Sequence, residues 1–144
     1  MISIKLNRIL AMAFGAAFVF ALSTQVMAQG PEELYASFYY NKTTGSYGMS
    51  SNYDTVESAE ERAYEECSTF GEGCRQIVTF QGCGAFAEWR GEEDGNVFGY
   101  SSEFSTLKGA LDRAMQECMD RNDGYKCGII MYACSYPYGE QEDE

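Results

Sequence analysis

The sequence predicts an α+β fold in which two tandem β-β-α-β repeats share one core with pseudo-twofold symmetry and are stabilised by disulfides. Residues 47–67, YGMSSNYDTVESAEERAYEEC, recur without a gap as residues 98–118, FGYSSEFSTLKGALDRAMQEC, at an offset of 51 residues. The cysteines follow in the same order in both copies. One helix with about three strands is too small to bury a core alone. Two copies are therefore expected to pack together about an approximate twofold axis.

The first repeat, about residues 34–80, is expected to run strand, turn, strand, helix, strand. Residues 34–53 alternate around a turn at 41–46, and their aromatic and β-branched side chains suit strands. Asp54 is expected to cap the helix, with Glu57 completing a capping box. Residues 74–80 form a compact strand of the buried type. The apolar face of the helix has three- and four-residue spacing and consists of Val56, Ala59, Ala63, Cys67 and Phe70.

The second repeat, about residues 83–135, follows the same order. Strands are expected at 83–89, 97–102 and 127–134, with a turn at 90–96. Ser105 is the expected helix cap. The buried face of this helix is expected to contain Leu107, Ala110, Leu111, Ala114, Met115 and Cys118.

Residues 1–28 have the layout of a secretory signal peptide. Lys5 and Arg8 precede an apolar run at 9–22, and Val26 and Ala28 place small side chains before a cleavage site after Ala28. The apolar run is short for a membrane span. We expect a periplasmic or secreted domain, residues 29–135, with no stable membrane insertion, and an acidic disordered tail at 136–144. An uncleaved N-terminal anchor is the alternative.

The chain is strongly acidic, with a formal net charge of −12. Loss of Lys5 and Arg8 with the signal peptide leaves 8 basic against 22 acidic residues, a charge of −14. Nucleic acids and anionic lipids require cationic side chains, so neither is an expected partner. The charge favours a basic protein partner. The alternative is that it only keeps an exported domain soluble.

Six cysteines in an exported domain of this size predict three disulfides. The chain has no histidine and no Cys-x-x-Cys pair, so no metal site and no cofactor are predicted. Connectivity is not fixed by sequence, but the repeat favours two short disulfides that each tie a helix end to the next strand. The third would then link the copies. The favoured pairs are Cys67–Cys74, Cys118–Cys127 and Cys83–Cys134.

An aromatic-Gly pair precedes each helix, small residues recur in each helix, the cysteines keep one order and a Gly-Cys-Gly-Ala segment begins the second copy. The residues of this pattern are Tyr47, Gly48, Ala59, Ala63, Cys67, Cys74, Ile77, Val78, Gly82, Cys83, Gly84, Ala85, Phe98, Gly99, Ala110, Ala114, Cys118, Cys127 and Cys134. With this pattern the chain resembles the DUF4189 family of small exported bacterial proteins. The resemblance covers about residues 35–134, implies an α+β fold with disulfides and implies no chemistry.

Without histidine, the usual Ser-His and Cys-His catalytic pairs are absent. A carboxylate enzyme acting on a glycan remains an alternative, with a Trp89 ring available to stack on a sugar. The competing interpretation is that these acids form a solvated hairpin turn. Calcium is not predicted, because the acids lack the alternating spacing of a calcium loop. The candidate carboxylates are Glu88, Glu92, Glu93 and Asp94.

Aromatic residues make up 15% of the chain, more than one small core requires. Some should be exposed and suit a protein interface, unless both faces of each sheet are covered by side chains. The candidate partner-binding residues are Trp89, Glu92, Glu93, Asp94, Tyr39, Tyr47 and Tyr100.

These observations favour an exported, non-enzymatic binding protein. Its sharpest form is an acidic inhibitor or immunity-type protein that binds a cationic toxin or a cell-wall-degrading enzyme. A secreted effector or an envelope structural protein is an alternative, and the carboxylate-dependent enzyme is another. The oligomeric state is left open.

Overall fold

The computed structural model describes residues 33–91 and 96–138. The first half is a three-stranded antiparallel sheet covered by one helix. Its elements are β1 (Tyr35–Tyr40), β2 (Tyr47–Tyr53), α1 (Val56–Ser68) and β3 (Arg75–Phe80), with strand order β2-β1-β3. The central strand is almost wholly buried and alternates in side-chain direction, so one of its faces meets α1 and the other meets the second half.

The second half has the same order of elements. It contains β4 (Cys83–Arg90), β5 (Asn96–Phe104), α2 (Leu107–Asp120) and β6 (Gly128–Cys134), and its strand order is β5-β4-β6. The expected α+β class is therefore confirmed. Among the described residues, no helix has the length and apolar character needed to cross a membrane.

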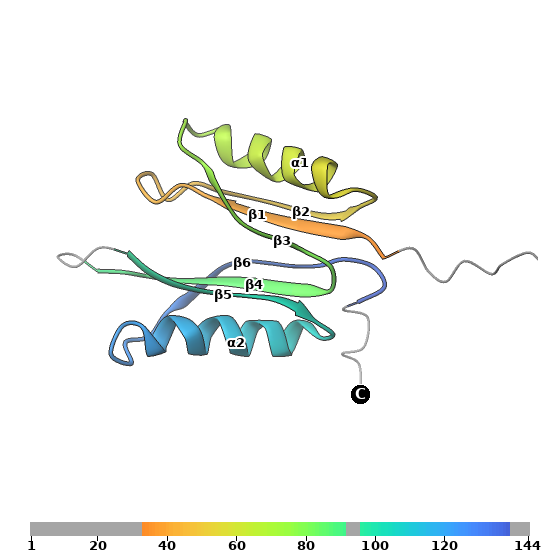
Figure 1. The fold of residues 1–144 in the computed structure, drawn as a ribbon. Helices are drawn as coiled ribbons and strands as arrows, with labels where there is room; N and C mark the ends of the chain where they lie inside the picture. Colours follow the sequence, from red (N-terminus) through yellow and green to blue (C-terminus); the bar gives the residue numbers. More distant parts are fainter. Residues whose placement is uncertain (1–32, 92–95, 139–144) are drawn as a thin grey trace, which may run out of the picture.

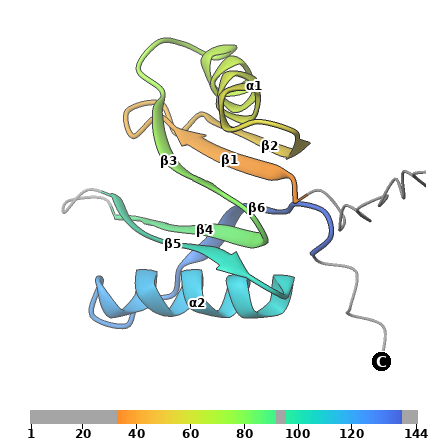
Figure 2. The same ribbon diagram turned by 45° about the vertical axis from the view of Figure 1, so that its right-hand side comes forward.

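The two sheets stack face to face, and each helix covers an outer face (Figure 1). The view in Figure 2 shows the same four layers, with α1 and α2 on opposite sides of the molecule. Strand β2 lies against β6, and β3 lies against β5. The inner faces bury an apolar cluster between the sheets made of Ala36, Phe38, Tyr40, Phe80, Phe86, Met131 and Ala133.

Each helix begins one residue later than the sequence analysis expected. Thr55 caps α1, and its hydroxyl accepts a hydrogen bond of 3.1 Å from the amide three residues on. Thr106 caps α2 in the same way at 3.2 Å. Asp54 and Ser105 were the wrong caps, because the residue directly before the first helical position is the one whose side chain can reach that amide.

Each helix lies very close to the second strand of its half. A Cβ on Gly48 would lie 2.0 Å from the carbonyl oxygen of Ala63, and one on Gly99 would lie 2.5 Å from that of Ala114. Real Cβ atoms do not approach so closely, so only glycine fits at these two strand positions. The small residues in the helices and the glycines in the strands therefore serve one purpose, which is to let two backbones approach.

A buried serine fixes this approach in both halves. The Ser50 hydroxyl donates to the carbonyl of Ala59 at 2.7 Å and accepts from a β1 amide at 3.1 Å. The Ser101 hydroxyl donates to the carbonyl of Ala110 at 2.7 Å and accepts from a β4 amide at 3.1 Å. Each hydroxyl thus gives a strand amide a partner and adds a hydrogen bond to a helix carbonyl, which ties the helix to the sheet.

All six cysteines are paired, in the connectivity favoured above. Cys67–Cys74 and Cys118–Cys127 each join a helix end to the approach to the following strand. The sequence analysis expected Cys83–Cys134 to link the two halves, and that expectation is wrong. This disulfide joins β4 to β6 within the second sheet, because the two cysteines face each other in the ladder.

The disulfides should differ in their contributions to stability. Cys83–Cys134 closes a loop with a sequence separation of 51, against 7 and 9 for the other two. On the chain-entropy estimate, its replacement by two alanines should cost about 4 kcal/mol, and loss of either short bond about 2.5 kcal/mol. Urea unfolding of the three double variants checks this order. Equal losses would contradict it.

The close approach predicts a sharp response to one added methyl group. Gly48→Ala or Gly99→Ala should each lower the free energy of unfolding by about 3 kcal/mol, because the methyl meets rigid helix backbone. Gly128→Ala is the matched control, since its Cβ would lie 3.9 Å from its nearest neighbour, the Glu88 carbonyl oxygen. If thermal or urea unfolding gave similar values for all three variants, the close approach would not be the constraint described here.

Candidate functional site

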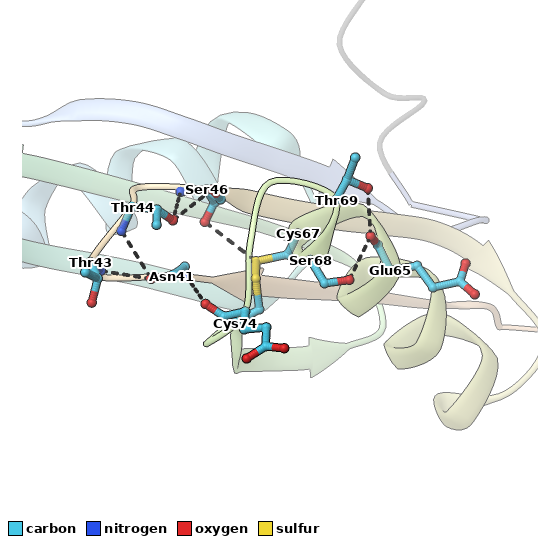
Figure 3. The surroundings of a disulfide bond; sticks show 10 residues. Asn41, Thr43, Thr44, Ser46, Glu65, Cys67, Ser68, Thr69 and Cys74 are labelled. Atoms are coloured by element: carbon cyan, nitrogen blue, oxygen red, sulfur yellow. Dashed lines mark hydrogen bonds between the residues drawn. A yellow bond between two sulfur atoms is a disulfide. The ribbon is translucent and has the colours of Figure 1, made fainter.

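One end of the first half forms a braced corner, shown in Figure 3. It consists of the β1–β2 turn at residues 41–46 with the first residue of β2, Tyr47, the last turn of α1 from Glu65, and the loop at residues 69–74. The Cys67–Cys74 disulfide lies at its centre. We call this surface the Cys67–Cys74 corner.

Asn41 connects the turn to the loop. Its side-chain oxygen accepts hydrogen bonds from the amides of Thr43 at 2.9 Å and Thr44 at 3.2 Å. Its side-chain nitrogen donates to the carbonyl of Glu72 at 2.8 Å. Asn41 is only 3% exposed, so a buried side chain holds two exposed segments together.

The end of α1 is held from the other side. The hydroxyls of Ser68 and Thr69 donate to the carbonyl of Glu65 at 3.1 and 3.0 Å. The sulfur of Cys67 lies 3.6 Å from the carbonyl oxygen of Ser46. The turn, the helix end and the loop are therefore fixed relative to one another before any ligand arrives.

This corner presents an open hollow of about 570 Å³. Two aromatic side chains border it, Phe70 at 72% exposure and Tyr47 at 43%. Phe70 was expected on the buried face of the helix, and that expectation was wrong. The helix ends at Ser68 and Gly71 turns the chain at φ +135°, so helical spacing no longer decides where Phe70 points. The other lining residues are Thr44, Gly45, Ser46 and Glu66.

The helix beside the hollow is acidic. The 13 residues of α1 contain one basic residue, Arg62. The glutamates of α1 are Glu57, Glu60, Glu61, Glu65 and Glu66. An acidic helix with exposed aromatic rings at its end favours a cationic ligand, which both the carboxylates and the ring faces attract.

A second cleft, of about 600 Å³, lies on the other side of the turn. The two hollows share Thr44. Lys42 and Arg75 border this cleft, and the Lys42 ammonium lies 5.4 Å from the centre of the Phe98 ring. Glu72 also lines this cleft, so the cleft carries both signs of charge, whereas the charged residue that lines the first hollow is Glu66.

The competing interpretation, in which the candidate carboxylates form a solvated turn, is wrong for Glu88. Glu88 is 4% exposed and faces the space between the sheets. The Tyr40 hydroxyl donates to one carboxylate oxygen, as does Asn96 at 2.9 Å, and the Arg90 guanidinium donates to the other at 2.7 Å. Successive side chains of a strand point to opposite faces, so Glu88 points between the sheets, whereas its neighbours Ala87 and Trp89 point toward α2.

This arrangement is a poor one for acid–base catalysis. A catalytic carboxyl must reach its substrate, whereas among residues 33–91 and 96–138 the hydrogen bonds of Glu88 go to Tyr40, Arg90 and Asn96. Within residues 33–91 and 96–138, no three metal-ligating side chains gather into a possible metal site. Three of the candidate carboxylates, Glu92, Glu93 and Asp94, lie outside the described residues.

The other predicted partner-binding residues are not brought together. Tyr39 is half-buried beneath α1, with its ring 5.7 Å from that of Tyr64, and burial raises its pKa above 10.0. Trp89 is half-buried on the α2 side and stacks on Tyr125 at 5.7 Å. Tyr100 is 38% exposed on β5. Of the described candidates, only Tyr47 lines the corner, and no sequence signal identified Phe70 or Glu66 as its neighbours there.

The Tyr40–Glu88 contact predicts a pH-dependent stability. Burial, and then the hydrogen bond to Glu88, raise the pKa of Tyr40 above 10.0. The folded state therefore holds the proton of the Tyr40 hydroxyl more tightly than the unfolded state does. The stability that this contact contributes is complete below pH 10 and is lost as the pH rises through the pKa of Tyr40 in the folded state. Tyr40→Phe should cost about 2 kcal/mol at pH 8, and the gap to wild type should narrow by pH 11 in urea unfolding.

Tyr132→Phe is the control. Tyr132 is 52% exposed, and its hydroxyl makes no hydrogen bond among the described residues. Its substitution should change the free energy of unfolding by less than about 0.5 kcal/mol. A Tyr40→Phe gap that stays constant or widens above pH 10 would contradict the assignment.

Comparison with known proteins gives one match. The family model described as "Domain of unknown function (DUF4189)" covers residues 35–134. No curated protein and no solved structure matches the chain. The matched region runs from the first residue of β1 to the last residue of β6, and so includes both sheets, both helices and all three disulfides. The chain therefore belongs to the DUF4189 family.

Proposed function

We propose that this chain is an exported, non-enzymatic binding protein and that the Cys67–Cys74 corner binds a basic protein. The observation that carries the proposal is Phe70, a large apolar side chain left 72% exposed in a loop that a disulfide and Asn41 hold in place. Exposed aromatic side chains on a pre-organised surface are typical binding hot spots, because little entropy is lost when they are covered.

The charge around Phe70 supports a basic partner. Glu66 lines the same hollow, and α1 carries five glutamates against one arginine. Acidic surfaces steer cationic partners and speed their association. In its sharpest form, the proposal is an inhibitor or immunity-type protein that covers a site on a cationic toxin or a cell-wall-degrading enzyme.

The location of the protein follows the same reasoning. Three disulfides indicate an oxidising compartment, either periplasmic or extracellular. We also propose that a signal peptide is removed after Ala28. Residues 1–28 lie outside the described residues, so this step rests on the sequence alone. Such a compartment would also contain the proposed partners.

The pseudo-twofold relation between the halves is also proposed. The paired glycines, the paired serines and the threonine caps all recur at a spacing of 51 residues. The contact of β2 with β6 and that of β3 with β5 exchange under such a rotation. A shared scaffold would leave the outer surfaces of the two halves free to differ, which is where a binding function would reside.

A capture experiment tests the binding proposal. The oxidised domain, residues 29–144, is immobilised and exposed to the exported proteins of its own cell. We expect recovery of one basic protein in stoichiometric amount, with an affinity that falls steeply as salt increases. Phe70→Ser should weaken that binding at least about tenfold, since hot-spot substitutions cost about 2 kcal/mol or more.

Tyr132→Ser is the matched control, because Tyr132 is a similarly exposed aromatic residue on β6, outside the corner. It should bind as wild type does. Capture that is insensitive to both salt and Phe70→Ser would contradict the proposal. Recovery of glycan that the protein then cleaves would favour the carboxylate enzyme instead.

A further inference from the structure

The two halves differ at one position that bears directly on the corner. At a spacing of 51 residues, Phe70 corresponds to Arg121. At this spacing, α2 extends one residue further than α1, which ends at Ser68. One hydrogen bond of the helix end nevertheless recurs: the amide of Gly71 donates to the carbonyl of Ser68 at 3.1 Å, and the amide of Asn122 donates to that of Met119 at 3.3 Å. Phe70 and Arg121 therefore each lie directly before this recurring hydrogen bond.

In the second half, Arg121 makes two contacts at the end of α2. One nitrogen of its guanidinium donates to the Glu117 carboxylate, and another donates to the carbonyl of Phe98 at 3.0 Å. Glu117 is partly buried, with 19% of its side chain exposed. The arginine thus joins the last turn of α2 to β5.

The first half retains the acceptors but lacks the arginine. Glu66 corresponds to Glu117, and Tyr47 corresponds to Phe98. Both Glu66 and Tyr47 line the hollow. Within the part of the chain that the structure describes, no cation pairs with Glu66. Phe70 stands at the arginine position and borders the same hollow.

We propose that an arginine side chain of the partner occupies this hollow and makes there the contacts that Arg121 makes within the second half. The inference rests on the proposed function and names the chemistry of its site. The guanidinium would donate to the Glu66 carboxylate and to the carbonyl of Tyr47. Its flat face would lie against the exposed rings of Phe70 and Tyr47, an arrangement that suits guanidinium better than ammonium.

The test is a titration of the isotopically labelled, oxidised domain followed by amide chemical shifts. The probe is N-acetyl-arginine amide. We expect weak, saturable binding with shifts at Tyr47, Glu66 and Phe70. N-acetyl-citrulline amide, which has the same shape without the charge, should bind at least about fivefold more weakly, and N-acetyl-lysine amide should also bind more weakly.

Two reciprocal variants sharpen the test. Phe70→Arg should supply the missing side chain from within, pair with Glu66 and reduce probe binding at least about fivefold. Arg121→Phe should open the equivalent place in the second half and create a second set of shifts at Phe98 and Glu117. Glu66→Gln should also weaken probe binding, because it removes the charge of the carboxylate while leaving Phe70 and Arg121 in place.

Equal binding of the citrulline and arginine probes, or shifts that avoid the corner, would overturn the inference. Retention of full probe binding by Phe70→Arg and Glu66→Gln together would also overturn it. The two proposals fail separately. If protein capture depends on Phe70 but the arginine probe does not bind, the proposed binding function stands and the proposed arginine contact is wrong. If the arginine probe binds but no protein is captured, the arginine site stands and the proposed binding function is wrong.

Discussion

Within residues 33–91 and 96–138, the inner face of each sheet is covered by the other sheet. Phe38 and Tyr40 project from β1, and Tyr40 meets Phe86 of β4 with ring centres 5.0 Å apart. Three strands and one helix cannot bury enough apolar surface to offset the entropy of ordering the chain. The contact between the sheets is therefore the condition under which either half folds. The helices, the close-approach glycines and the disulfides act on a core that this contact closes.

That constraint also explains where variation is possible. Positions at the sheet–sheet contact and beneath the helices leave no room, as Gly48 and Gly99 show. The ends of the helices face outward and have no such limit. Arg121 and Phe70 lie at these ends, where the second half has a partly exposed Arg121–Glu117 ion pair and the first half has an exposed aromatic side chain beside Glu66. A binding surface of the proposed kind would therefore alter one half without disturbing the core between the sheets.

The order of elements was predictable because strong periodic signals produce it. The alternating strands, the alanine stripe of each helix and the cysteines that recur in both copies all predicted the correct elements, since these patterns reflect burial directly.

The wrong predictions concern local geometry. Capping depends on which of two adjacent polar residues is extended, so Thr55 was missed in favour of Asp54. Phe70 fits the helical pattern perfectly but follows the last helical residue. Glu88 resembles the acids that come after it, yet strand alternation turns it inward. The hollow itself joins residues from a turn, a helix and a loop, and no pattern within a single element could have revealed it.

Native-state hydrogen exchange tests the central claim, mutual burial of the two sheets, most directly. If neither half is stable alone, the most protected amides of β1 and β4 exchange only through complete unfolding. Their opening free energies should then be equal to each other and to the free energy of global unfolding. They should also fall with denaturant along one slope. Opening of β1 at a clearly lower free energy, while β4 remains protected, would contradict the account, because the second half would then be a folded unit without the first.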